Sequence, residues 1–159
     1  MRKILVLLLL SFILSFGGCQ NEPSDRIVTH GDLTITVPPH YQDISHYSSF
    51  KDSDFSYGFG ELTIVGDHIP LAELDGWTPS LMEFAQNFVL ANHLPNPPKK
   101  LDGMVTVYYE VEGDITWCWL AAFFQCSDGY WSIQSSCPAE TYMELEQTLL
   151  NILSTVQTS

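Results

Sequence analysis

Three runs of alternating residues, separated by short turn sequences, constrain the fold of this chain more than any other feature. The runs cover 104–111, 115–126 and 130–137, with a Gly-Asp pair at 113–114 and an Asp-Gly pair at 128–129. Such pairs are typical of the tight turns that join neighbouring antiparallel strands. The sequence therefore predicts a three-stranded antiparallel meander.

Two-residue turns would decide which residues share each face of this meander, because a shift of one residue moves a strand's side chains to the other face. One face would then be core, formed by Val105, Val107, Tyr109, Cys118, Leu120, Ala122, Phe124, Trp131, Ile133 and Cys137. The opposite face would carry a mixture of aromatic and polar side chains.

Four aromatic residues on that opposite face form a candidate binding face: Tyr108, Trp117, Trp119 and Phe123. Trp and Tyr combine a large apolar area with a polar group, so this face suits a sugar ring, a peptide or a partner protein. The alternative is that a helix expected over 79–92 covers the face and makes it core.

Two helices and further strands complete the predicted fold. Thr78-Pro79 marks a helix start, and apolar residues then recur at helical spacing, as they do again after Pro138. A hairpin is expected over 27–37, and a strand with a glycine bend over 55–65. Together the elements predict an α+β fold with an antiparallel sheet flanked by helices in three layers.

The N-terminus predicts export. Two basic residues precede an apolar run of 13 residues at 4–16, which is shorter than the roughly 20 residues of a membrane-spanning helix. The run ends just before Cys19 and resembles a bacterial lipoprotein signal, with Phe16 where Leu is usual. The resemblance implies a signal peptide over 1–18, a lipidated Cys19 with a tether over 19–26, and a single domain over 27–157.

The charge balance limits the partners. The chain has 6 Lys and Arg against 19 Asp and Glu, for a formal net charge of −13. Removal of 1–18 would leave four basic residues. We therefore expect no nucleic-acid partner, because phosphate binding requires a basic surface.

The order of elements resembles the PsbP-like fold family, which includes a photosystem II accessory protein, a Ran-binding import factor and the bacterial lipoprotein DcrB. The resemblance rests on the run LTITVP at 33–38, WSI at 131–133, Cys137-Pro138, Tyr142, Leu145 and Ile152. It covers about 27–157 and implies an antiparallel sheet with helices on both faces. It also implies action through binding partners and no enzyme activity. No site residue of the family can be transferred.

Three cysteines follow Cys19, and none forms a C-x-x-C pair. In the predicted register, Cys118 and Cys137 lie on adjacent strands of the core face. They could form a disulfide in an exported protein, or all three, Cys126 included, could be buried thiols. No histidine lies near any of them in the sequence or in the paired strands, which argues against a catalytic cysteine.

No metal or cofactor is expected. A site could be imagined from Asp67 and His68 with Asp52 or Asp54, but no ligand spacing supports it, and the five histidines are better explained as surface residues. The chain also lacks a hydrolase G-x-S-x-G motif and a dinucleotide-binding loop.

The leading functional hypothesis is a cell-envelope lipoprotein that binds a protein or a small molecule and is not an enzyme. The alternative is an acidic inhibitor or immunity-type protein whose charge steers it onto a cationic enzyme. An envelope hydrolase is a third hypothesis. The sequence does not predict the oligomeric state.

Overall fold

The structure is a computed structural model that describes residues 24–159. The predicted signal peptide and the lipidation site at Cys19 lie outside the described residues. No helix among residues 24–159 combines the length and the apolar character that a bilayer-spanning segment requires.

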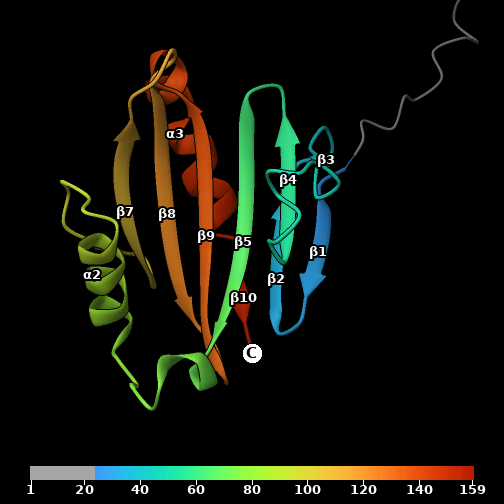
Figure 1. The fold of residues 1–159 in the computed structure, drawn as a ribbon. Coiled ribbons are helices and arrows are strands. Elements are labelled where there is room, and N and C mark those ends of the chain that lie inside the picture. The colour runs from blue at the N-terminus through green and yellow to red at the C-terminus, as the bar shows by residue number, and fades with distance from the viewer. Residues whose placement is uncertain (1–23) are drawn as a thin grey trace, which may run out of the picture.

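Two antiparallel sheets form the scaffold of the described part of the chain (Figure 1). The large sheet has seven strands in the order β3-β4-β5-β9-β8-β7-β6: Gln42–Asp43, Phe55–Phe59, Leu62–Pro70, Gly129–Pro138, Trp117–Gln125, Met104–Val111 and Lys99–Leu101. The small sheet has three strands in the order β1-β2-β10: Arg26–His30, Leu33–Val37 and Gln157–Thr158. Every strand pair is antiparallel.

The two long helices lie on opposite faces of the large sheet (Figure 1). Helix α2 (Leu81–Ala91) covers β7 and β8 on one face, and α3 (Ala139–Leu153) crosses the other face. A short 3₁₀ helix, η1 (Leu71–Leu74), follows β5. The predicted α+β class, with an antiparallel sheet between helices, is confirmed.

Each face of the large sheet has its own apolar core. The larger core joins α3, the small sheet and one sheet face through residues such as Leu33, Ile35, Leu120, Ile133 and Leu149. The smaller core, beneath α2, is built from Ala85, Val105, Val107, Tyr109, Ala121 and Phe123. The residues of both cores lie within 28–156.

The register of the meander differs from the prediction by one residue in its first hairpin. Val105 pairs with Phe123, because five residues (112–116) connect β7 to β8 where a two-residue turn at 113–114 was expected. This shift moves Val105, Val107 and Tyr109 from the predicted core face to the α2 face, where they form the second core.

The second hairpin is displaced by two residues. Its turn centres on 127–128, and Cys118 therefore lies directly opposite Cys137. A displacement of two residues preserves the faces, so the predicted core positions on β8 and β9 are correct.

The 55–65 segment is not one bent strand. It forms a hairpin of β4 and β5, in which Phe59 pairs with Leu62 and Gly60 takes a φ of 59°. Glycine adopts this left-handed conformation without the steric cost that other residues bear. The tight turn explains Gly60, at which the sequence suggests a bend.

Candidate functional site

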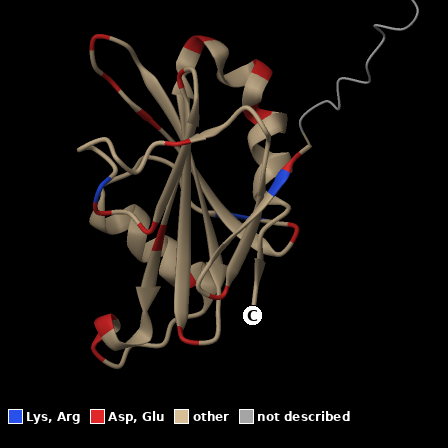
Figure 2. Cartoon of the chain, turned by 90° about the vertical axis from the view of Figure 1, so that its right-hand side faces the viewer, with Lys and Arg blue, Asp and Glu red and all other residues tan. Residues whose placement is uncertain are grey.

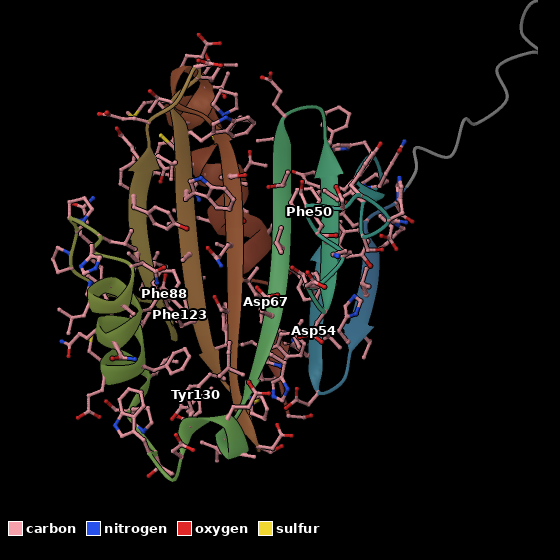
Figure 3. The ribbon with its side chains drawn as sticks, viewed as in Figure 1. Phe50, Asp54, Asp67, Phe88, Phe123 and Tyr130 are labelled. Carbon is pink, nitrogen blue, oxygen red and sulfur yellow. The ribbon has the colours of Figure 1, made fainter. Side chains whose placement is uncertain are left out.

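The predicted aromatic binding face does not exist as one surface. Phe123 is completely buried beneath α2, where the rings of Phe84 and Phe88 pack edge-on against it at centroid distances of 5.8 and 5.1 Å (Figure 3). Trp119 is half-buried and stacks on Tyr109 at 6.1 Å. The alternative, a face covered by the helix, describes these residues correctly.

The remaining two predicted residues lie elsewhere. Trp117 begins β8, where it pairs with Val111 and Pro138 and is half-buried. Tyr108 lies on the opposite face of the sheet, against α3, because of the one-residue register shift. The four residues therefore cannot bind one ligand together.

Tyr108 instead lines a groove between α3 and the β6–β7 edge of the large sheet. We call this the β6–α3 groove; it has a volume of about 580 Å³. Its apolar wall is formed by Leu101, Tyr108, Leu120, Tyr142, Met143 and Leu150. Lys99, Lys100 and Glu146 supply charge at its rim.

Hydrogen bonds hold the two tyrosines of the groove in place. The Tyr108 hydroxyl donates to the Glu110 carboxylate and lies 3.0 Å from the Cys118 sulfur. The Tyr142 hydroxyl donates to Glu146 at 3.1 Å, and the two rings lie 4.8 Å apart. Burial raises the pKa of both phenols, and the neighbouring carboxylates raise it further, so both stay protonated at neutral pH.

The groove opens beside an unpaired strand edge. Within residues 24–159, β6 is the last strand in the sheet order and pairs only with β7. Lys99 and Leu101 pair with Thr106 and Met104, which places their side chains on the same sheet face as Tyr108. An apolar groove, an open edge and a cation thus occur together.

Basic residues are scarce in the part of the chain that the structure describes. They are Arg26, Lys51, Lys99 and Lys100, while acidic residues are spread over loops and strand ends (Figure 2). The adjacent pair at the groove is therefore a local exception in an acidic surface.

Cys118 and Cys137 are free, buried thiols in the structure, although they face each other across β8 and β9. Each has a polar neighbour: Tyr108 for Cys118, and Thr141 for Cys137. A bridge between them stays a prediction, which a count of reactive thiols in the unfolded protein would test.

One contact was missed by the sequence analysis: His68 Nε2 lies 3.5 Å from the Cys126 sulfur. The pair does not have the arrangement of a cysteine nucleophile with its base. The same nitrogen also contacts Asp128 at 3.0 Å, whereas a catalytic triad uses the two ring nitrogens separately. Burial also raises the pKa of Cys126 to about 11, which opposes formation of a thiolate.

The imagined site around Asp67 and His68 is not assembled. These neighbours point to opposite faces of β5, because side chains alternate along a strand. The Asp54 carboxylate accepts the backbone N–H of His68 at 2.6 Å and not its ring.

The fold is similar to that of PsbP-like proteins of known structure. A solution structure of the cyanobacterial PsbP protein CyanoP from Synechocystis matches with a TM-score of 0.56 at 14% identity, covering 91% of this chain and 99% of that one. The yeast Ran-binding protein Mog1p from Saccharomyces cerevisiae matches with a TM-score of 0.55 at 13% identity, covering 86% and 96%.

A third similar structure comes from Bacteroides thetaiotaomicron, with a TM-score of 0.56 at 10% identity. It covers 87% of this chain, which spans only 49% of that protein. No protein-family model and no curated protein matches the sequence. The similarity therefore establishes the PsbP-like fold alone.

Proposed function

We propose that this protein is a cell-envelope lipoprotein that binds a partner protein and does not catalyse a reaction. The β6–α3 groove is the observation that carries the proposal, because it joins a concave apolar surface to an open strand edge. Cys19, directly after the apolar N-terminal run, would carry the lipid.

The groove suits an extended peptide segment of the partner. A peptide can add as a further strand to an exposed sheet edge, with main-chain hydrogen bonds for affinity and pockets for alternate side chains. At β6, every second side chain of such a peptide would enter the groove beside Tyr108 and Met143. Lys99 on the same face favours an acidic residue in that peptide.

The polar groups of the groove support binding over catalysis. The two tyrosine hydroxyls already donate to Glu110 and Glu146, and burial raises the pKa of both phenols. A general acid or base works best with a pKa near the operating pH, whereas the pKa values of these phenols are raised further above neutral pH.

A charge reversal in the groove tests this proposal. Residues 24–159 would be used to select binders from a display library of random peptides. We expect peptides in which acidic and apolar residues alternate, and we expect Lys99→Glu to weaken their binding by about tenfold or more. Lys51→Glu makes the same charge change away from the groove and should bind normally. Equal binding by both variants, or selection of no acidic peptide, would contradict the proposed groove function.

The anchor is tested separately. Expression of the full chain with labelled palmitate should give a labelled protein, and Cys19→Ala should abolish the label. A secreted, unlabelled wild-type protein would rule out the lipoprotein part of the proposal and leave the groove untouched.

A second candidate is an acidic inhibitor or immunity-type protein, which the excess of 19 acidic over 6 basic residues favours. Its partner would be cationic, opposite in sign to the peptide expected in the groove. Association with a basic enzyme such as lysozyme should then be fast and should slow steeply with salt. Association that is absent, or indifferent to salt, would eliminate this candidate.

A further inference from the structure

Side chains capable of binding a metal ion meet where three distant segments of the chain come together. Asp32 lies in the turn between β1 and β2, His68 on β5, and Cys126 at the end of β8. One donor atom from each of the three lies within 4.8 Å of the other two. The Asp128 carboxylate, from the turn between β8 and β9, contacts both His68 and Cys126.

The donor atoms of His68, Cys126 and Asp128 lie nearly as far apart as ligands around a zinc ion, and the Asp32 oxygen lies within 4.8 Å of the His68 and Cys126 donors. Bonds of about 2.3 Å to sulfur and about 2.0–2.2 Å to nitrogen or oxygen place tetrahedral ligands roughly 3.4–3.6 Å apart. Here His68 Nε2 lies 3.5 Å from the Cys126 sulfur and 3.0 Å from Asp128 Oδ1. The sulfur and Asp128 Oδ1 are 3.6 Å apart. Small side-chain movements would admit the ion.

A neighbouring group already orients one of the carboxylates. The Trp131 Nε1–H donates to Asp32 Oδ1 at 2.8 Å. The other oxygen, Asp32 Oδ2, is buried and has no hydrogen-bond partner among residues 24–159. Buried polar atoms normally have partners, and metal-ligating carboxylates are typically hydrogen-bonded through a second group. Asp32 therefore offers a buried oxygen without a geometrically defined hydrogen bond among residues 24–159, and its carboxylate lies close enough to the Cys126 thiol to interact with it.

Backbone hydrogen bonds hold the contributing turns in position. The Ser159 N–H donates to the Asp32 carbonyl at 3.1 Å, and the Ser127 N–H donates to the Ser159 carbonyl at 3.3 Å. Gly31, with a φ of 55°, forms the turn that places Asp32 beside the indole N–H of Trp131. Figure 1 shows this turn at the end of the molecule where the last strand, β10, also ends. The donor atoms are thus brought together by the fold itself.

We propose that Asp32, His68 and Cys126, with Asp128 in the fourth position, form a Zn²⁺ site. A set of one imidazole, one thiolate and carboxylates suits zinc, whereas calcium and magnesium prefer oxygen ligands alone. With four protein ligands, the ion has a structural role: it ties the β1–β2 turn and the β8–β9 turn to β5. The site is independent of the β6–α3 groove.

Metal titration of residues 24–159 tests the site. Calorimetry should show one Zn²⁺ bound per chain, and the melting temperature should rise with Zn²⁺. Co²⁺ should produce the near-ultraviolet charge-transfer absorption of a thiolate–cobalt bond. Cys126→Ser and His68→Gln should each weaken Zn²⁺ binding by roughly a hundredfold or more, since even indirect changes around metal sites cost 10- to 100-fold.

His46→Gln is the matched control, because His46 is exposed in a loop and should not affect binding. Circular dichroism of the metal-free variants would show whether each is folded. If Cys126→Ser does not fold, the Zn²⁺ affinity of His68→Gln alone tests the site. Absence of stoichiometric Zn²⁺ binding would overturn the proposal. Binding by Cys126→Ser or His68→Gln at wild-type affinity would also overturn it.

Discussion

The carboxyl group of Asp67 is half-buried on β5, on the α2 face of the large sheet and close to Asp54 (Figure 3). Burial raises the pKa of Asp67 above its ordinary value of 3.8, and the Asp54 charge adds to the effect, while a hydrogen bond from Ser53 opposes it. The folded protein therefore binds a proton here more tightly than the unfolded chain does.

This shift has a defined consequence for stability. A raised folded-state pKa means that the free energy of unfolding falls as pH rises from about 4 through that pKa. Asp67→Asn should therefore be more stable than wild type at pH 7, and the difference should vanish below pH about 4. Urea unfolding at several pH values measures this, with exposed Asp114→Asn as the control. A variant less stable than wild type at pH 7 would show that the ionised carboxylate is stabilising.

Residue-scale chemistry was the least predictable from the sequence. The Asp32–His68–Cys126 cluster joins residues that are 36 and 58 positions apart. No local spacing signals it, and it depends on the small sheet lying against the large one. The role of Tyr108 was misjudged for a different reason, since it followed from a register that was one residue off.

At the scale of elements, the N-cap of helix α2 lies two residues later than the sequence predicts. Thr78-Pro79 predicts the cap, but Ser80 is the N-cap residue. Its Oγ accepts the Glu83 N–H at 3.3 Å, and the Glu83 carboxylate accepts the Ser80 N–H at 2.7 Å. Pro79 stays outside the helix, with its carbonyl accepting the hydroxyl of Tyr130.

Ser80→Ala should therefore destabilise the protein by about 1 kcal/mol, the usual cost of losing a capping side chain. Thr78→Ala, at the predicted cap, should change the stability little. The free energies of unfolding of the two variants, from thermal or urea unfolding, show whether Ser80 or Thr78 caps the helix. A larger effect at Thr78 would mean that the helix begins earlier than the structure shows.

The strands themselves were predictable because their residues alternate and their turns contain glycine or aspartate. The connection between β7 and β8 was the weak point. Gly113 suggested a two-residue turn. The actual connection has five residues, so each side chain of β7 points to the sheet face opposite to the predicted one. β6 and β10 are too short, with three and two residues, to produce an alternating signal.

At the scale of the whole molecule, two amphipathic helices and a sheet with two apolar faces were enough to predict the architecture. The helices must cover both faces, because each face carries residues that are buried completely, such as Val107 on one and Ile133 on the other. The groove was not predictable, because it lies where α3 leaves the edge of that sheet uncovered.

Two exposed apolar residues allow a direct test of the proposed partner binding. Met143 of α3 is 82% exposed at the β6–α3 groove, and Leu90 of α2 is 71% exposed on the other side of the sheet. A photo-crosslinking amino acid would replace each in turn in the full chain, expressed in its own cells. Mass spectrometry would then identify the cross-linked segments.

We expect the Met143 position to cross-link to an extended, acidic segment of one partner protein, and we expect Lys99→Glu to remove this product. The Leu90 position should give no such product. Cross-linking of the partner from Leu90 and not from Met143, or no dependence on Lys99, would contradict the claim that this protein acts by binding a partner in the β6–α3 groove.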